Sequence, residues 1–329
     1  MSTTTTTVPS AGPVAGSRSF LSRMREGDEI VRLITFLFAA SVVLVTLLLV
    51  FELWQGSVLP RHKFGLNFFR TSVWDPIFEQ FGALPFIYGT LITAGVALVI
   101  AVPLGIGAAI FLAELAPARV SDTLEFFIDL LAAVPSVIYG LLGVFIVVPL
   151  MRQYIQPALK NTLGFLPLFQ GPIYGVGFLT AGIVLAIMVI PYIISVSREV
   201  LMSVPRDQRE AALSLGSTRW ESTWQVVVPF ARGGIMGSIF LALARALGET
   251  MAVTMVIGNA PVISASLFSP GDSIASVIAN QFTEATGDLY LQSLIELGLV
   301  LFLLTFILNG LARLLIVATS QKGSAMGHA

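Results

Sequence analysis

The run Ala83–Ala113, ALPFIYGTLITAGVALVIAVPLGIGAAIFLA, contains no charged residue. A helix needs about 20 apolar residues to cross about 30 Å of hydrocarbon, so this run is long enough to span a membrane and to tilt in it. Pro85 and Pro103 are expected to kink the helix, because proline cannot donate a backbone hydrogen bond. The run therefore predicts a membrane-spanning helix.

Five further runs of the chain are similarly long and apolar, namely Leu33–Phe51, Leu130–Met151, Ile173–Ser197, Gly233–Gly258 and Leu291–Ala318. In the last of them Glu296 and Arg313 lie near the ends, where we expect their side chains to snorkel to the lipid headgroups. The whole chain of 329 residues is 56% hydrophobic and only 11% charged, with a mean hydropathy of +0.89. A soluble domain carries about 25% charged residues. We find no strand pattern, and the prediction is an all-α, polytopic membrane protein with six spans.

Composition also excludes several kinds of chemistry. The chain has no cysteine, and its two histidines are His62 and His328, so we expect no disulfide and no metal site. Lys63, Lys160 and Lys322 each lack the preceding glycine of a phosphate-binding P-loop. The net charge is -1, without a basic face for nucleic acid. We find no catalytic residue set, and an enzyme is a poor interpretation.

The basic residues predict which side of the membrane each loop faces. Six spans place both termini on one side. That side carries 12 basic residues, Arg18, Arg23, Arg25, Arg32, Arg119, Arg198, Arg206, Arg209, Arg219, Arg232, Arg313 and Lys322, against 5 on the other, Arg61, Lys63, Arg70, Arg152 and Lys160. The richer side is normally cytoplasmic, so both termini are expected in the cytoplasm. We expect a disordered tail at 1–29, a six-helix domain at 30–318 and a second tail at 319–329.

The loop at 198–232 separates the fourth span from the fifth. Its sequence is REVLMSVPRDQREAALSLGSTRWESTWQVVVPFAR. Val204, Gln208, Ala211 and Leu215 follow a helical spacing, which predicts a short amphipathic helix that ends at Gly216. On amphipathicity alone, a helix lying on the lipid surface is an equally good interpretation.

The spacing of this loop resembles the EAA loop of ABC importer permeases, Glu-Ala-Ala, three residues, Gly, nine residues, Ile-x-Leu-Pro. The matching positions are Glu210, Ala211, Ala212, Gly216, Val226, Val228 and Pro229, with Val in place of Ile and Leu. In that family the loop is a coupling helix that docks in a groove of the ATP-hydrolysing subunit. The resemblance implies the same role here, with Glu210 making polar contacts at the docking surface.

Two charges, Arg245 and Glu249, lie near the middle of the fifth span. A charge at that depth costs about 3 kcal/mol or more, so such residues usually face a cavity or one another. Their spacing of four puts both on one face of a continuous helix, and we expect Glu249 to partner Arg245 at rest. A structural pair is the alternative to a station on a solute path. The planar guanidinium favours an anion, and Gly248 suggests close packing against a neighbouring helix.

A narrower resemblance lies in PSVIYG at Pro135–Gly140 and ETMAVTMVIGN at Glu249–Asn259. These segments are similar to the PstC-type permease of the phosphate-specific ABC importers, over about residues 30–317. The resemblance implies a type I importer permease (MetI-like) fold in a bacterial cell membrane, with Arg245 and Glu249 on a phosphate path. It implies as partners a PstA-type permease, two PstB-type ATPases that hold ATP and Mg, and an external PstS-type binding protein. No cofactor is then expected on this chain.

Other interpretations remain open. An ion-coupled secondary transporter would use Glu249 as a proton carrier, and a permease for another oxyanion, a channel or a membrane sensor are further alternatives. Ser136, Thr250, Thr254 and Asn259 are weaker candidates for the path, because hydroxyls commonly satisfy the helix backbone. We expect Tyr88 and Tyr139 to be packing residues, Gly105 and Gly107 to be helix contacts, and residues 272–288 to form a short external helix that packs the mouth or receives a binding protein.

Overall fold

The computed structural model describes residues 28–325 and the side chains of 31–314. Six helices of the described part are long and apolar enough to cross a membrane, at Val31–Gln55, Leu84–Leu115, Ser136–Leu163, Phe178–Met202, Arg219–Leu247 and Asp288–Leu314. The six-span prediction is confirmed. The expected N-terminal tail lies outside the described residues except at its last two positions, and the final helix continues to Ala325.

The chain divides into two units, Met1–Glu52 and Leu53–Ala329. Helix α2 (Asp28–Gln55) supplies the described part of the first unit and is apolar around its circumference, as Phe36, Leu37, Leu44 and Leu48 show by their exposed side chains. Such a helix needs lipid or another apolar surface around it.

The second unit is a helical bundle with short irregular connections. Its elements are α3 (Val58–Phe64), β1 (Trp74–Asp75), β2 (Gln80–Phe81), α4 (Leu84–Ile110), α5 (Ala118–Ala132), α6 (Ser136–Leu142), α7 (Val148–Leu150), α8 (Gln156–Leu163), α9 (Phe178–Met202), α10 (Arg206–Ser214), α11 (Arg219–Ser222), α12 (Val228–Leu247), α13 (Met251–Ile257), α14 (Ile274–Gln281) and α15 (Asp288–Ala325). Four π-helical turns join neighbouring segments, at Phe111–Leu115, Gly143–Val147, Met151–Ile155 and Thr223–Val227.

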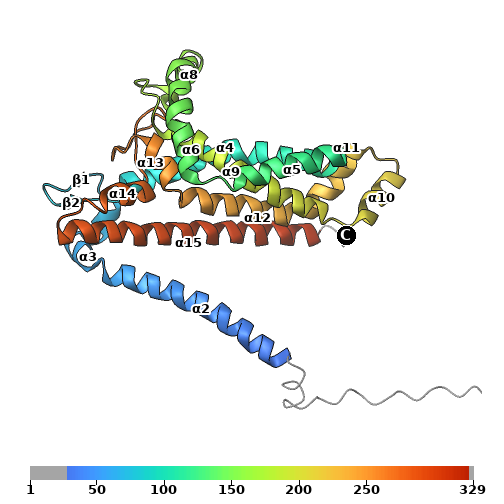
Figure 1. The fold of residues 1–329 in the computed structure, drawn as a ribbon, viewed down its shortest axis with the longest axis horizontal. Helices are drawn as coiled ribbons and strands as arrows, with labels where there is room; N and C mark the ends of the chain where they lie inside the picture. The colour runs from blue at the N-terminus through green and yellow to red at the C-terminus, as the bar shows by residue number, and fades with distance from the viewer. Residues whose placement is uncertain (1–27, 326–329) are drawn as a thin grey trace, which may run out of the picture. The chain divides into compact units, whose positions relative to one another are not determined.

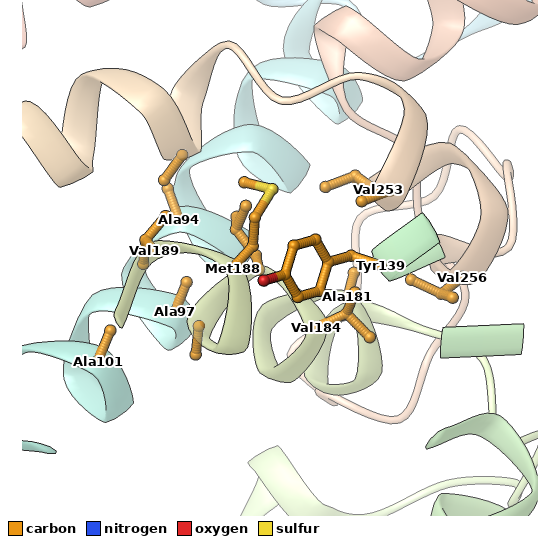
Figure 2. Packing of buried hydrophobic residues seen from close by; sticks show 14 of the residues in the cluster. Ala94, Ala97, Ala101, Tyr139, Ala181, Val184, Met188, Val189, Val253 and Val256 are labelled. Atoms are coloured by element: carbon orange, nitrogen blue, oxygen red, sulfur yellow. The ribbon is translucent and has the colours of Figure 1, made fainter. Parts of the chain in front are cut away.

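Helices α4 and α9 form the centre of the bundle. Ala94, Ala97 and Ala101 are buried on α4, in the same cluster of buried side chains as Val189 of α9 (Figure 2). Small side chains allow two helices to approach closely. At Gly105 a Cβ atom would come within 2.7 Å of Ile193 on α9, so the expectation that this glycine is a helix contact is confirmed.

The short elements gather at the two ends of this bundle (Figure 1). Helices α10 and α11 lie at one end, which the C-terminal part of α15 also reaches. Helices α3 and α14 and the antiparallel pair β1–β2 lie at the opposite end. The polar loop and the last helix therefore end on one side, as an even number of spans requires.

The third and fifth predicted spans differ most from the structure in their ends. The third predicted span, Leu130–Met151, is wrong at its start, because α5 ends at Ala132 and a new helix begins at Ser136 after Pro135. The fifth begins at Arg219, inside the expected polar loop, and α12 ends at Leu247. The β1–β2 pair was not predicted, since two-residue strands are too short to carry an alternating pattern.

Glu296 does not snorkel to the headgroups. Its side chain is only 3% exposed and lies against the segment that contains α3. The prediction is wrong at this residue because it treated α15 as a helix alone in lipid, whereas α3 packs over its first turns: the backbone amide of Leu59 donates to Gln292 Oε1 at 2.9 Å. Arg313, near the other end, is exposed as expected.

Candidate translocation site and coupling loop

The predicted amphipathic helix of the polar loop is α10. It ends where expected: Gly216 has a φ of +90°, in the left-handed region that favours glycine. The hydroxyl of Ser217 donates to the carbonyl of Ala212 at 2.7 Å and satisfies an end of the helix. The chain therefore turns sharply between α10 and α11.

Helix α11 begins with a capping box. Thr218 Oγ1 accepts from the backbone amide of Glu221 at 3.3 Å, and Glu221 Oε2 accepts from the amide of Thr218 at 2.8 Å. This pair fixes the start of the helix that continues through the π turn at Thr223–Val227 into α12. Helix α11 is therefore the first part of the fifth span.

A surface hollow of about 450 Å³ lies between α10 and α11. Three of the seven residues of the EAA-like motif, Ala211, Ala212 and Val226, are in its wall, together with Leu215, which is 90% exposed. Glu210 is exposed on the same helix outside the hollow, while Val228 and Pro229 begin α12. The motif therefore forms an open surface at one end of the bundle, not a buried core.

Arg209 joins this surface to the second span. Its Nη2 lies 2.8 Å from Glu114 Oε1, in the π turn that ends the second span. The same guanidinium donates to the carbonyl of Leu201, in the last turn of α9, at 2.7 Å. It also donates to the carbonyl of Val204, which follows the end of that helix. One side chain thus connects α10, the second span and the end of the fourth.

Arg198 makes a comparable connection one turn deeper. It is 7% exposed on α9, pairs with Glu125 of α5, and its Nη2 donates to Ser121 Oγ at 3.1 Å. A charge this well buried needs such partners, since an unpaired one would be strongly destabilising. The polar end of α9 is therefore fixed to both α5 and α10.

Arg245 lies in the last turn of α12, inside the membrane-spanning part of the bundle. Its guanidinium carbon is 4.2 Å from the ring centroid of Tyr192 on α9. Its Nε is buried and has no hydrogen-bond partner within the described residues. Stacking occupies the face of a guanidinium and leaves its N–H edges available to a ligand.

Tyr192 is itself held by the end of α5. Its hydroxyl donates to the carbonyl of Ala132 at 2.7 Å, and the hydroxyl of Tyr139 donates to the neighbouring carbonyl of Leu131 at 2.7 Å. Two tyrosines thus satisfy carbonyls that the helix end leaves free. The Tyr192 ring on which Arg245 stacks is therefore held in place by its hydrogen bond to Ala132.

Glu249 does not partner Arg245, and the prediction of an ion pair is wrong. The helix stops at Leu247 and restarts at Met251, so a spacing of four no longer places both residues on one helix face. Glu249 Oε1 instead accepts from the backbone amide of Ala252 at 3.2 Å, near the start of α13. No ion pair joins the two residues in the described part of the chain.

The weaker candidates are mostly engaged by the backbone. Thr250 Oγ1 donates to the carbonyl of Gly248 at 3.3 Å, and Thr254 Oγ1 to that of Thr250 at 2.7 Å. Asn259 accepts a hydrogen bond at 3.1 Å from the hydroxyl of Ser276, which lies on α14, the short helix within residues 272–288. Tyr88 donates to the carbonyl of Ser264 at 2.6 Å, a structural role. Ser136, the first residue of α6, is partly buried.

Two glycines, one in α6 and one at the start of the π turn that follows it, allow this part of the third span to approach α13 closely. At Gly140 a Cβ would lie 2.5 Å from Met255 Sδ, and at Gly143 it would lie 2.7 Å from Val256. Tyr139 packs between these helices, beside Val253 and Val256 (Figure 2). By contrast, Gly248 and Gly107 meet no neighbouring helix that closely, so neither is the packing contact that we expected.

Three site features were missed by the sequence analysis. The capping box has a visible local signal, Thr218 followed three residues later by Glu221. The contact between Arg209 and Glu114 and the stack of Arg245 on Tyr192 have none, because their partners are far apart in the chain. Within the described residues no group of three His, Asp or Glu side chains is placed to hold a metal ion.

The protein has six membrane-spanning helices, a buried arginine, Arg245, inside the bundle and a structured polar loop at one end. These features define a multi-pass membrane protein of the permease class. The model of the binding-protein-dependent transport system inner membrane component family matches residues 101–320. The chain belongs to this family. Solved structures support the same fold, since a bacterial alginate ABC transporter chain gives a TM-score of 0.54 at 15% identity, covering 90% of this chain and 96% of its own.

A second structural relative is the MetNI methionine ABC transporter, with a TM-score of 0.52 at 14% identity over 75% of this chain and 99% of that one. Curated relatives are more similar in sequence. The phosphate transport system permease protein PstC of Haemophilus influenzae is 50% identical over 87% of this chain and 92% of its own length. That of Mesorhizobium japonicum is 46% identical over 87% and 90%, and that of Xylella fastidiosa is 45% identical over 97% and 99%. The resemblance to PstC permeases is confirmed.

Proposed function

We propose that this chain is a membrane-spanning permease subunit of an ATP-driven phosphate importer, in which Arg245 contacts the anion on its path. The observation that carries the proposal is the buried Nε of Arg245, a donor without a partner among the described residues, on a guanidinium whose face is stacked on Tyr192. Phosphate presents oxygens that match the edge of a guanidinium. The names of the PstC relatives support phosphate over other oxyanions.

The helix break beside Arg245 keeps its guanidinium available to an anion. Gly248 to Thr250 separate α12 from α13, and Glu249 is directed to the amide of Ala252. No ion pair between Glu249 and Arg245 is found within the described residues, so an anion that reaches Arg245 has no carboxylate partner of that guanidinium to displace.

The polar loop is the proposed route for energy from ATP. The hollow between α10 and α11 would receive a partner ATPase subunit of the PstB type, which would hold ATP and Mg. Because α11 continues into α12, a displacement of the loop would change the fifth span and the setting of Arg245. A PstA-type permease and an external PstS-type binding protein would complete the assembly. In this arrangement both termini face the cytoplasm of a bacterial cell.

The experiment is uptake of labelled phosphate into membrane vesicles that contain this chain and its partners, with and without ATP inside and with a protonophore. We expect uptake that requires ATP and survives the protonophore. Arg245→Lys should lower it at least about tenfold, because a point charge replaces the planar donor set. Arg313→Lys, at the exposed end of α15, is the matched control.

Two results would contradict the proposal. Uptake driven by a proton gradient alone would favour an ion-coupled transporter with Glu249 as proton carrier. A fall of labelled phosphate uptake to about half with equimolar sulfate, both anions being saturating, would show no preference for phosphate and would favour a permease for another oxyanion.

A further inference from the structure

A separate pocket lies on the side of the bundle opposite to the polar loop. It has a volume of about 370 Å³ and is lined by Trp54, Arg61, Gly65, Leu66, Phe69, Glu296, Leu299, Val300 and Leu303. Most of these side chains are apolar, and Leu66 and Leu303 are exposed at its edge, 78% and 48%. Only Arg61 and Glu296 bring charge to it. The path around Arg245 and the hollow between α10 and α11 share no residue with it.

Glu296 brings a buried carboxylate to this pocket. The residue is 3% exposed, and its Oε2 is buried without a hydrogen-bond partner in the described part of the chain. A buried polar atom without a partner is costly and rare in native structures. Oε2 therefore marks a place where a hydrogen-bond donor is missing from the chain itself.

Arg61 brings a positive charge that does not reach Glu296. Its guanidinium carbon lies 3.7 Å from the ring centroid of Trp54. Nε donates to the carbonyl of Ser57 at 3.0 Å, and Nη2 donates to the carbonyl of Trp54. The stack and these two bonds hold the guanidinium, and no ion pair with Glu296 is found among residues 31–314. A cation and an anion thus face one pocket without contact between them.

We propose that this pocket binds a zwitterionic phospholipid whose headgroup carries a primary ammonium, that is, a phosphatidylethanolamine. The ammonium would donate to Glu296, and the phosphate would meet Arg61, whose Nη1 makes no hydrogen bond within the described residues. One acyl chain would lie along Leu299 and Leu303, which follow Glu296 toward the centre of the membrane on α15. Each charge of the headgroup would then meet a side chain of opposite charge, the ammonium at Glu296 and the phosphate at Arg61.

The location agrees with a lipid ligand. Glu296 is near the start of the sixth span, and Trp54 is at the end of α2, which is the depth at which tryptophan side chains meet headgroups. The amide of Leu59 donates to Gln292 Oε1 at 2.9 Å, so α3 is fixed to α15 and the two walls of the pocket stay together. A soluble anion would leave the apolar wall uncovered, and a purely apolar ligand would leave Oε2 unsatisfied.

Native mass spectrometry of the full chain in its membrane assembly tests the proposal. The probes are phosphatidylethanolamine and phosphatidylcholine with identical acyl chains, added in equal amounts, with phosphatidylglycerol added in a parallel sample. The first two lipids have the same net charge, but the trimethylated ammonium of the choline lipid cannot donate a hydrogen bond to Glu296. We expect the wild type to retain the ethanolamine lipid about tenfold more than the choline lipid, the effect of one charge-assisted hydrogen bond.

In the variant Glu296→Gln we expect this preference to be lost, so that the two lipids are retained about equally. Glu284→Gln, which removes an exposed carboxylate outside the pocket, should leave it at about tenfold. Leu303→Trp is a second variant, which fills the apolar wall without changing either charge, and it should reduce the number of retained lipids by one. It keeps the test decisive if Glu296→Gln does not fold.

Three outcomes of the comparison between lipids would overturn the proposal. They are equal retention of the two lipids by the wild type, a preference that survives in Glu296→Gln, and stronger retention of phosphatidylglycerol, which has the phosphate but no ammonium. Absence of any retained lipid in the assembly would also overturn it.

Discussion

Arg209 on α10 and Glu114 at the end of the second span form an ion pair of 2.8 Å between Nη2 and Oε1. Their side chains are 21% and 11% exposed, so the pair is only partly screened by solvent. Arg209 also bonds two carbonyls at the end of α9. The loop proposed to receive the ATPase is therefore attached to the second and fourth spans by one guanidinium.

Removal of this pair should loosen the loop from the bundle. We expect Arg209→Ala to lower the free energy of unfolding by about 2 kcal/mol, because a partly buried ion pair and two hydrogen bonds to backbone carbonyls are lost together. ATP-driven phosphate uptake should fall about tenfold. A double-mutant cycle with Glu114→Gln, followed by thermal unfolding, should give a coupling of about 1 kcal/mol or more. Arg206→Ala, on an exposed position of the same helix, is the control. If the effects of Arg209→Ala and Glu114→Gln on the free energy of unfolding were additive, the ion pair would not connect the loop to the second span.

The turn at Gly216 should tolerate substitutions according to their backbone preference, not their size. A Cβ atom there would meet nothing within 4 Å, but its φ of +90° is strained for other residues by about 1–2 kcal/mol. We expect uptake to decrease in the order Gly216, Gly216→Asn, Gly216→Ala, Gly216→Val.

Gly233→Ala, in α12 and equally open, should leave uptake unchanged. If Gly216→Val were as active as Gly216→Asn, the left-handed turn would not matter for coupling.

Tyr192 should act on transport through the position of Arg245. Loss of the ring in Tyr192→Leu removes the stack at 4.2 Å, worth about 1–2 kcal/mol, and frees the guanidinium to rotate. We expect the apparent KM for phosphate to rise about tenfold, whereas Tyr192→Phe, which keeps the ring and loses only the bond to Ala132, should change it about twofold.

Tyr154→Leu, at a residue that is 65% exposed on the third span, controls for a general effect of losing a tyrosine. Equal KM values for the Leu and Phe variants would argue against a positioning role for the ring.

Asp272, in the connection before α14, should make stability depend on pH. It is 2% exposed, and burial raises the pKa of its carboxyl to about 6, although the Ser276 side chain and the backbone amide of Ser273, which donates to Oδ1 at 2.8 Å, lower it. A carboxyl whose pKa is higher in the folded state binds a proton more tightly there. Its contribution to stability is therefore present below about pH 4 and is lost as pH rises to about 6.

The variant Asp272→Asn keeps an acceptor for the amide of Ser273 and carries no charge. We expect it to be more stable than the wild type by about 3 kcal/mol at pH 7.5, and by a decreasing margin as pH falls below 6. Thermal unfolding of the purified protein between pH 4.5 and 8 measures this. A margin that is independent of pH would show that the carboxyl of Asp272 is not buried in its charged form.

Features that depend on nearby residues could be predicted from the sequence. The spans follow from apolar length, the α10 helix from its spacing, and its end at Gly216 from the one residue type that readily takes a positive φ. Pro135 could have indicated the break between α5 and α6, since the residue before a proline avoids helical geometry.

Glu249 shows why the site could not be completed in this way. Its spacing of four from Arg245 predicts a pair only if the helix is continuous, and nothing in the local sequence requires the helix to stop at Leu247. The break lies where the chain leaves α12 and α13 begins, and α13 packs closely on Gly140 and Gly143, far away in the sequence.

By itself the sequence determined the membrane class, the six spans and the polar loop, because hydropathy and helical period are local properties of the chain. Only the tertiary structure decided which charges meet. Arg209 reaches Glu114, Arg245 stacks on Tyr192 and Glu296 is buried beside α3, and each of these contacts depends on how distant helices pack in three dimensions.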